Sequence, residues 1–387
     1  RKYHYRTGQI NLTLFEVDMK ILFVSNSSWN LYNFRRPLIS ALIMDGHEVS
    51  CLCKESKTKL SLINELGCKI VAELEHVNPR IKNPMADFFL MRELFKKYKD
   101  IKPDVIFLYT PKLNIYGGIV ARILGIQYIN NITGLGSEFT RKMRLPFYIK
   151  LLYRWSLRKA IRVISHNAHD LDYLISNGIC KKENSEVIPG SGIDLEYFTS
   201  ERKIKSVVNF LFSGRFLEEK GVIEYLEAAI FLSSRYSHHI WNLVGDNYGV
   251  GSRRIDKLIE KAKLISNIRM YEFTDNIKQY YEAFDCFVLP SYREGLSKSL
   301  LEAMSMERIV IASDVPGCRE AIKQGVNGFL MASQNTIELT NIMEKVIHLK
   351  ESEIEKLCME ARAQVKNVFS KQIIVGLYKS IIQGLAK

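Results

Sequence analysis

The sequence predicts an α/β protein built from two parallel sheets, each covered by helices on both faces. Short runs of β-branched and aromatic residues alternate with longer amphipathic segments along the chain. The short runs are apolar throughout, which is typical of parallel strands that are buried on both faces. Because 387 residues is more than an ordinary single domain contains, we expect two domains.

The expected elements fall into two sets, one in each half of the chain. The strands expected in the first half are Lys20–Ser25, His47–Cys53, Lys69–Ala72, Val105–Tyr109, Gln127–Asn131 and Val163–Ser165. Those expected in the second half are Asn209–Ser213, Trp241–Val244, Ile268–Tyr271, Cys286–Pro290 and Ile309–Ala312. The helix-like segments between them include Pro37–Met44, Met85–Tyr98, Ile223–Ser233, Asn276–Phe284 and Ser299–Met306. Alternation of this kind predicts two Rossmann-like domains that face each other.

The domain boundaries are expected where the composition changes. We expect an N-terminal domain over residues 19–198, a polar linker over 199–206 and a second domain over 207–368. Residues 369–387 are expected to form a C-terminal helix that packs back on the N-terminal domain. Residues 1–18 show neither a helical nor a strand pattern. We expect them to be an extension outside the fold, with a small ordered arm as the alternative.

The composition excludes several classes of protein. No stretch approaches about 20 uninterrupted apolar residues, so no membrane-spanning helix is predicted, and the pattern of a secretory leader is not seen. The cysteines are odd in number, scattered and without a Cys-x-x-Cys motif. This indicates reduced thiols in a cytosolic protein rather than disulfides or a zinc site.

The positive charge of the chain is concentrated in its first half. The formal net charge is +13, of which residues 1–200 carry +10 and residues 201–387 only +3. Residues 139–169 contain no acidic residue but eight cations, which are Arg141, Lys142, Arg144, Lys150, Arg154, Arg158, Lys159 and Arg162. Such a segment predicts an anionic partner, which can be a membrane surface, a phosphorylated acceptor or a nucleic acid.

The strongest functional signal is the segment that follows the expected strand Cys286–Pro290. Glu294 and Glu302 stand eight positions apart, and a glycine and an expected helix start follow Glu294. A glycine-led helix start at the end of a parallel strand presents free backbone N–H groups to a phosphate. The two carboxylates can then accept hydrogen bonds from two sets of hydroxyls, such as those of a sugar nucleotide. The alternative is a loop acid that caps the helix and a solvated helix acid.

A second signal follows the expected strand Asn209–Ser213. Arg215 and Lys220 flank a short turn, and two cations at that separation suit a diphosphate. Two solvated loop cations are the alternative. Further turns at the ends of strands follow in the same half, at 243–246 and 314–320.

Taken together, these motifs resemble the retaining glycosyltransferases of family 4, which have the GT-B fold. The resemblance runs from residue 19 to about residue 385. It rests on the Glu-x7-Glu segment, the Gly-Arg…Lys-Gly turn, Val187–Asp194, and Pro316–Ile322 with Gly325–Phe329. In the first half, Ser28–Pro37 and Asn131–Gly136 are similar to members that build bacterial surface polysaccharides on a polyprenyl diphosphate carrier.

The resemblance implies a role for each matching residue. Glu294 would bind the hydroxyls of the donor sugar, Glu302 would hold the ribose, and Arg215 with Lys220 would neutralise the leaving diphosphate. The backbone N–H groups of Gly295, Leu296 and Ser297 would meet that diphosphate, and Gly214 is also expected to bind the donor. Residues expected on the acceptor side are Asn26, Arg35, Lys112, Gly134, Gly136 and Asn167.

The chain departs from the family pattern at three places. Thr110-Pro-Lys112 stands where many members have a histidine, so a histidine-assisted step is not expected. His166 precedes Asn167 where Gln is usual, and Glu307 stands where Gly is usual. The implied mechanism is retaining, with the leaving phosphate deprotonating the incoming hydroxyl, so it needs no protein nucleophile.

No metal or other cofactor is expected. Asp170-Leu-Asp172 imitates the Asp-x-Asp of metal-dependent glycosyltransferases, but residues two apart on a helix point away from each other. We therefore interpret this pair as a solvated helix start. His166 and His169 have no third ligand in view and are expected to be incidental.

The segment 141–162 is expected to bind an anionic membrane surface. It interleaves cations with apolar residues that can separate onto different sides of a helix, and Lys150, Arg154 and Arg158 would make the contact. The alternative is a helix packed on the core with a solvated basic edge. A polyprenyl diphosphate acceptor requires such docking because its lipid cannot leave the bilayer.

The function expected from the sequence is transfer of a hexose or N-acetylhexosamine from a nucleotide sugar, with UDP preferred, to a polyprenyl-diphosphate-linked glycan. The enzyme would lie on the inner face of the cytoplasmic membrane. A sugar-nucleotide epimerase and a non-catalytic nucleotide-sugar-binding protein are the alternatives. A nicotinamide oxidoreductase is excluded because Val24–Asn30 lacks Gly-x-Gly-x-x-Gly. A nucleic-acid-binding protein is excluded because no motif of that class is found.

Overall fold

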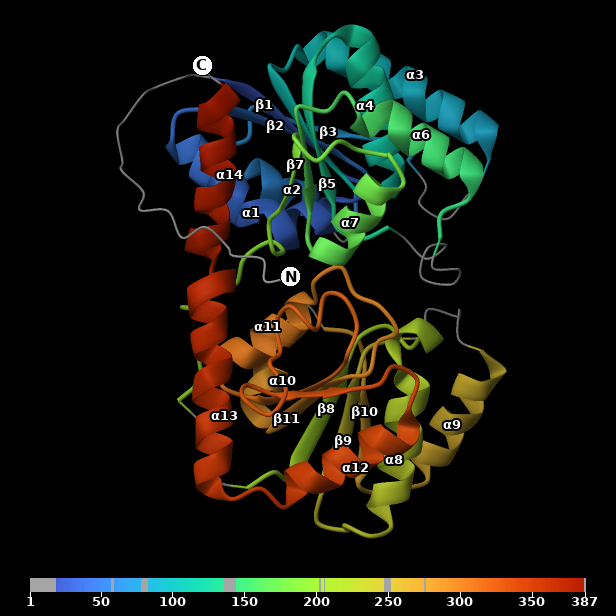
Figure 1. Cartoon of the computed structure of the whole chain (residues 1–387), viewed down its shortest axis with the longest axis vertical. Helices are drawn as coiled ribbons and strands as arrows, with labels where there is room; N and C mark the ends of the chain where they lie inside the picture. The colour runs from blue at the N-terminus through green and yellow to red at the C-terminus, as the bar shows by residue number, and fades with distance from the viewer. Residues whose placement is uncertain are drawn as a thin grey trace.

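The computed structural model describes residues 19–385 except 57–58, 78–82, 136–143, 202, 205, 247–251 and 275. The described residues form two sheets, one in each domain, with the N-terminal domain uppermost in Figure 1. All strand pairs within the two sheets are parallel. The predicted class, two Rossmann-like domains with parallel sheets, is therefore confirmed. Residues 1–18, expected to be an extension, lie outside the described residues.

The first sheet has seven strands in the order β3-β2-β1-β4-β5-β6-β7. The strands are β1 (Lys20–Val24), β2 (Glu48–Cys53), β3 (Ile70–Glu73), β4 (Val105–Tyr109), β5 (Gln127–Ile132), β6 (Arg162–Ser165) and β7 (Ser185–Val187). The helices are α1 (Ser28–Met44), α2 (Lys59–Asn64), α3 (Pro84–Ile101), α4 (Pro111–Leu124), α6 (Phe147–Leu157) and α7 (Ala168–Ser176). Helices α3, α4 and α6 pack together and share one apolar core with the sheet, whereas α1 contributes to a separate core.

The second sheet has six strands in the order β10-β9-β8-β11-β12-β13. The strands are β8 (Asn209–Ser213), β9 (Ile240–Val244), β10 (Ile268–Tyr271), β11 (Cys286–Leu289), β12 (Ile309–Ser313) and β13 (Phe329–Met331). The helices are α8 (Val222–Ser233), α9 (Arg253–Lys263), α10 (Lys278–Ala283), α11 (Lys298–Ser305), α12 (Thr336–Ile347) and α13 (Glu351–Gln364). A 3-10 helix η1 (Glu218–Lys220) and a π-helical turn (Val365–Phe369) complete the domain. In both sheets the strand order reverses beside the first strand, which is where α/β proteins bind ligands.

The chain passes between the domains at two places that are hydrogen-bonded to each other. The Ile193 N–H donates to the Phe369 carbonyl at 2.8 Å, and the Lys371 N–H donates to the Ile193 carbonyl at 2.8 Å. The Lys371 ammonium also pairs with Asp194 at 2.9 Å. The last helix, α14 (Lys371–Leu385), then runs up against the N-terminal domain in Figure 1. It adds three side chains to the core beneath α1, namely Ile374, Tyr378 and Ile382.

The structure differs from the predicted elements in two respects. It contains two edge strands, β7 and β13, that the apolar pattern does not predict; the three residues of β7 are all half-buried. Helix α1 begins at Ser28 rather than at Pro37, so this proline lies inside the helix. A proline has no N–H to donate, and the Asn33 carbonyl one turn earlier therefore loses its helical partner.

Candidate active site

The loop that follows β11 lies against residues of the other domain. The Gly295 carbonyl accepts a hydrogen bond at 2.7 Å from the side chain of Asn167, which follows β6 and caps α7. A Cβ atom on Gly295 would lie 1.9 Å from the carbonyl oxygen of Thr133, which follows β5. The backbones at Gly295 and Thr133 are thus so close that only glycine fits at position 295. The carboxyl ends of the two sheets therefore meet at residues 294–297, where the sequence predicts phosphate and sugar contacts.

Lys220 and Glu294, two of the predicted catalytic residues, form an ion pair. The lysine Nζ lies 2.7 Å from the glutamate Oε1, and the side chains are 25% and 12% exposed. The lysine is placed here because η1 ends at Gly221, whose φ is +72°. A Cβ at Gly221 would lie 2.0 Å from the Pro290 carbonyl oxygen, so only glycine allows the turn to approach the end of β11 this closely.

Arg215, the third predicted catalytic residue, lies exposed in the loop after β8. It forms no ion pair with any residue that the structure describes. The loop is fixed at the strand end because the Gly214 N–H donates to the Val244 carbonyl at 3.0 Å. A Cβ at Gly245 would lie 1.9 Å from the Gly214 carbonyl oxygen, so the two loops are in close contact. The loop therefore offers an uncompensated cation at the sheet edge that also carries Lys220.

The start of helix α11 provides backbone donors. The Ser297 hydroxyl caps this helix by accepting a hydrogen bond from the Leu300 N–H at 3.3 Å. The Ser297 N–H itself donates to the Gly317 carbonyl at 3.4 Å. The N–H groups of Gly295 and Leu296 have no acceptor within the described part of the chain. Two of the three expected donors are therefore free for a diphosphate.

Glu302, the residue expected to hold the ribose, is buried in the second turn of α11. Burial raises the pKa of its carboxyl, and the Lys298 ammonium, 3.5 Å away, opposes this rise. The same ammonium donates at 2.7 Å to the Asn33 carbonyl, which Pro37 leaves without a helical partner. It also lies 5.2 Å from the centre of the Phe34 ring. Lys298 thus links α11 to α1 of the other domain. The sequence motifs do not identify this residue.

A second charged contact between the domains corrects an expectation. Arg293 pairs with Asp170 of α7, and the two side chains are 6% and 0% exposed. The prediction that Asp170 and Asp172 form a solvated helix start is therefore wrong for Asp170. Its charge is compensated by an arginine 123 residues further along the chain, whereas Asp172 is exposed. Over the described residues, no group of three or more His, Cys, Asp or Glu side chains is arranged to hold a metal ion.

Sequence families match both domains. The family described as "Glycosyl transferases group 1" matches residues 196–366, which include Lys220, Glu294 and α11. The family described as "Glycosyl transferase 4-like" matches residues 20–167. The chain is a glycosyltransferase, and each of its two domains matches one of these families.

Two curated relatives of this glycosyltransferase have defined reactions. The chain is 27% identical over 394 residues to a Campylobacter jejuni enzyme, with 95% of this chain and all of the relative covered. That relative is named N,N'-diacetylbacillosaminyl-diphospho-undecaprenol alpha-1,3-N-acetylgalactosaminyltransferase. This chain is also 24% identical over 317 residues to the Escherichia coli UDP-Gal:alpha-D-GlcNAc-diphosphoundecaprenol alpha-1,3-galactosyltransferase, with 77% of this chain and 80% of that relative covered.

Solved structures of other glycosyltransferases share the fold. The Anabaena protein HepE, in complex with UDP and glucose, matches with a TM-score of 0.78 and 18% identity, over 94% of this chain and 99% of HepE. A glycosyltransferase from Rickettsia africae matches with a TM-score of 0.75 and 18% identity, over 96% of this chain and 99% of that protein. The two-domain arrangement is the GT-B fold, as expected from the sequence.

Some residues expected on the acceptor side of the glycosyltransferase lie at the junction of its domains. The Gly134 nitrogen is 3.6 Å from the position that a Cβ on Gly295 would occupy. Asn167 contacts the same residue through its side chain. Asn26 is half-buried in the loop after β1. Gly136 lies outside the described residues.

The two cations expected on the acceptor side are held differently. Lys112, at the start of α4, pairs with Asp87 of α3 at 2.7 Å. Arg35 of α1 is only 2% exposed, and its guanidinium lies 4.1 Å from the centre of the Tyr109 ring at the end of β4. One cation is therefore compensated by a carboxylate, and the other is packed on an aromatic ring.

Helix α6 contains half of the segment 141–162 that is expected to bind a membrane; residues 141–143 lie outside the described residues. Lys150 donates to the Asn177 side chain at 2.8 Å and Arg154 to the Gly178 carbonyl at 2.9 Å. Arg154 and Arg158 are both exposed. Four large apolar side chains of this helix are between 47% and 76% exposed, namely Phe147, Tyr148, Leu151 and Trp155. The helix thus turns apolar residues as well as cations outward. No helix of the described structure is both long and apolar enough to cross a membrane.

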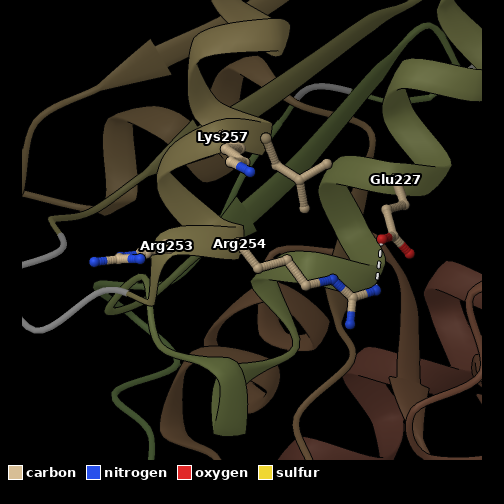
Figure 2. Close-up of a pocket in the computed structure, with 5 residues that line it drawn as sticks. Glu227, Arg253, Arg254 and Lys257 are labelled. Atoms are coloured by element: carbon tan, nitrogen blue, oxygen red, sulfur yellow. Dashed lines mark hydrogen bonds and ion pairs between the residues drawn. The ribbon is translucent and has the colours of Figure 1, made fainter.

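A surface pocket in the second domain lies between α8 and α9 (Figure 2). In it, Arg254 of α9 pairs with Glu227 of α8 at 2.7 Å. One turn earlier on α8, Glu224 accepts a hydrogen bond at 2.8 Å from the hydroxyl of Tyr292. Tyr292 begins the loop that carries Glu294, so α8 fixes the start of that loop. The sequence motifs do not identify this contact because the two residues lie 68 positions apart.

Proposed function

We propose that this glycosyltransferase moves a hexose or N-acetylhexosamine from a UDP-sugar to a glycan linked through a diphosphate to a polyprenyl lipid. The C. jejuni and E. coli relatives are both named for acceptors of that kind, and HepE has been crystallised with UDP-glucose. The structural observation that carries the proposal is the Lys220–Glu294 ion pair beside the exposed Arg215 and the start of α11. These residues offer both positive and negative charge where the carboxyl ends of the two sheets meet.

The chemistry of transfer explains why both signs of charge are required. As the nucleoside diphosphate leaves, the sugar becomes oxocarbenium-like and negative charge grows on the leaving oxygens. Arg215, Lys220 and the free N–H groups at the start of α11 stabilise that negative charge. Glu294 accepts hydrogen bonds from the sugar hydroxyls and orients the ring. The departing phosphate accepts the proton of the incoming hydroxyl from the same face, which retains the anomeric configuration.

Replacement of the two cations tests this assignment. Arg215→Ala and Lys220→Ala should each lower the turnover number about 100-fold or more, because each removes a stabiliser of the leaving group. A matched control is Lys203→Ala, which removes another Lys–Glu ion pair of this domain, to Glu307 at 2.5 Å, with the lysine 66% exposed. The assay measures nucleotide release from a panel of UDP-sugars with a short diphosphate-linked acceptor. Near-normal turnover in both cation variants would refute the site.

The same assay separates the alternative functions. A transferase releases nucleotide in proportion to the acceptor glycosylated. An epimerase would convert the nucleotide sugar with no acceptor present, and a non-catalytic binding protein would bind the donor without turnover.

We further propose that the enzyme docks on the inner face of the cytoplasmic membrane through α6. Its exposed apolar residues suit the interfacial region of a bilayer, and Arg158 with the neighbouring Lys159 suits anionic headgroups. Helix α3 also packs on α4 and exposes Met85, Phe88 and Phe89. The two helices together form an apolar and basic surface of the N-terminal domain.

Sedimentation with liposomes of rising anionic lipid content tests the docking. Binding should grow with anionic lipid and weaken with salt. It should fall in the variant Lys150→Gln/Arg154→Gln/Arg158→Gln and in Leu151→Ser/Trp155→Ser. The control is Phe231→Ser on α8, an aromatic residue that is 53% exposed and has Arg235 over its ring, as Trp155 has Arg122. Equal sedimentation of parent and variants would leave α6 without this role.

A further inference from the structure

Arg35 is a buried cation with none of the partners that buried cations ordinarily have. Its side chain is 2% exposed and its Nε is fully covered without a hydrogen-bond partner. Its guanidinium contacts the Tyr109 ring but forms no hydrogen bond or ion pair with any described residue. A charge removed from water is ordinarily paired or hydrogen-bonded.

Two other buried arginines of the described residues follow the ordinary pattern. Arg308 is 1% exposed, and its guanidinium donates to two backbone carbonyls and to the Ser200 hydroxyl. Arg293 pairs with Asp170. Arg35 therefore differs from both in lacking an acceptor, which indicates that an acceptor arrives with a ligand.

Further unsatisfied polar groups lie at the ends of the neighbouring strands. The hydroxyls of Tyr109, the last residue of β4, and of Thr110, which follows it, are buried without partners in the described structure. The same holds for the Nε2 of His166, which follows β6. Thr110 has a φ of +71°, a strained value for a β-branched residue, and such strain is concentrated at functional sites. Burial and the charge of Arg35 both lower the pKa of His166 well below its usual range, so its imidazole is neutral.

We propose that Arg35, with Thr110 and His166, forms a second phosphate-binding subsite, which takes the diphosphate of the acceptor. The proposal rests on the proposed function, because that reaction brings two diphosphates into one site. The donor diphosphate has Arg215 and Lys220, in the second domain. The acceptor diphosphate needs a cation of its own on the N-terminal domain. His166 directly precedes Asn167, which contacts the donor loop, so the subsite lies beside the place of transfer.

Binding of inorganic pyrophosphate provides a direct test. Calorimetric titration is done on the enzyme saturated with UDP, so that the donor site is filled. We expect pyrophosphate to bind the parent and to bind Arg35→Met about 10- to 100-fold more weakly, with Arg35→Lys in between. The matched control is Arg36→Met on the same helix, since Arg36 is exposed and also lies over an aromatic ring, that of Tyr32. Circular dichroism and UDP affinity verify that each variant is folded.

Kinetics with two acceptors identify the source of the phosphate. One acceptor carries the sugar on a short polyprenyl diphosphate, and the other carries the same sugar on the same lipid alcohol without phosphates. Arg35→Met should lower kcat/KM about 10- to 100-fold for the first acceptor only, with KM for the donor unchanged. Equal losses for both acceptors, or pyrophosphate binding that Arg35→Met leaves intact, would overturn the subsite.

Two further results separate this inference from others. If UDP abolishes pyrophosphate binding, Arg35 serves the donor and the acceptor assignment is wrong. If the parent glycosylates no acceptor, the proposed function fails, while the titration still decides whether Arg35 binds a phosphate. Should Arg35→Met not fold, competition between pyrophosphate and the diphosphate-linked acceptor on the UDP-saturated parent gives the answer, and absence of competition refutes the subsite.

Discussion

Lys298 provides a test of how the two domains cooperate, because it contacts both. Its ammonium lies 3.5 Å from the carboxylate of Glu302 and donates at 2.7 Å to the Asn33 carbonyl of α1. Lys298→Met removes the charge but keeps the aliphatic stem over the Phe34 ring. The variant therefore isolates the electrostatic part of the contact.

The expected magnitude follows from these contacts. A hydrogen bond to a charged group contributes about 1.5–3 kcal/mol. The Lys298 side chain is 27% exposed, so solvent screening favours the lower value, about 1.5 kcal/mol, or a factor of about ten. We expect kcat/KM for the donor to fall about tenfold at neutral pH in Lys298→Met.

The pH dependence gives a second, independent readout. The groups that face the Glu302 carboxylate are Lys298 and the Tyr281 hydroxyl. Burial already raises the pKa of Glu302, and Lys298 restrains that rise. Without Lys298 the pKa rises further, so Glu302 becomes protonated at a higher pH than in the parent. The acidic limb of kcat/KM for the donor should therefore move to higher pH.

Lys278→Met is a closely matched control. Lys278 also pairs with a glutamate four residues later, at 3.3 Å, and also lies 5.2 Å from an aromatic ring, with a side chain 26% exposed. Its partner Glu282 is 49% exposed, whereas Glu302 is buried. Rates are measured over a pH series at limiting donor. If Lys298→Met and Lys278→Met gave the same pH profile and the same kcat/KM, the reasoning would be refuted.

Three further predictions follow from contacts between the domains and from the charges of the site. Asp170→Asn removes the carboxylate that pairs with the buried Arg293 and should cost about 3 kcal/mol by calorimetry, whereas Asp314→Asn, which breaks an exposed pair with Arg319, should cost less than about 1 kcal/mol. Gly295→Ala should abolish transfer but leave both domains folded, because its Cβ would meet the Thr133 carbonyl, whereas Gly384→Ala, with no atom within 4 Å, should be neutral in both assays. Activity should survive excess EDTA, since Arg215, Lys220 and the start of α11 supply the positive charge; a loss restored by Mg²⁺ or Mn²⁺ would contradict this.

The parts of the fold that could be predicted are the central strands, whose apolar side chains are buried when the sheet forms. The strand Val105–Tyr109 is fully apolar and fully buried, and its predicted bounds are confirmed. Strand β7 was not predictable because Ser185–Val187 is a short edge segment that is only half-buried. The start of α1 was not predictable either. A proline favours a helix start, so Pro37 suggests that the helix begins there. The Asn33 carbonyl, which Pro37 leaves without a helical partner, accepts a hydrogen bond from Lys298, and Lys298 lies 265 residues further along the chain.

The same distinction applies to the candidate site. Glu294 and Lys220 stand in local motifs, and the structure brings them into contact. Their roles stay predictions. The buried pair of Asp170 and Arg293 could not be predicted, because the aspartate alone suggests only a solvated helix start or a metal ligand. Its burial depends on a partner that only the folded chain brings near.

The return of α14 to the N-terminal domain has a consequence for how the protein is made. The strands of the first sheet end at residue 187, but Ile374, Tyr378 and Ile382 of the core beneath α1 are translated only after the whole second sheet. At roughly 5–20 residues per second, the ribosome needs about 10–40 s to make the intervening chain. During this time the first domain leaves the ribosome with one side of its core uncovered. The core beneath α1 can be completed only when the second domain has also been synthesised. The two domains therefore finish folding together rather than in the order in which they are translated.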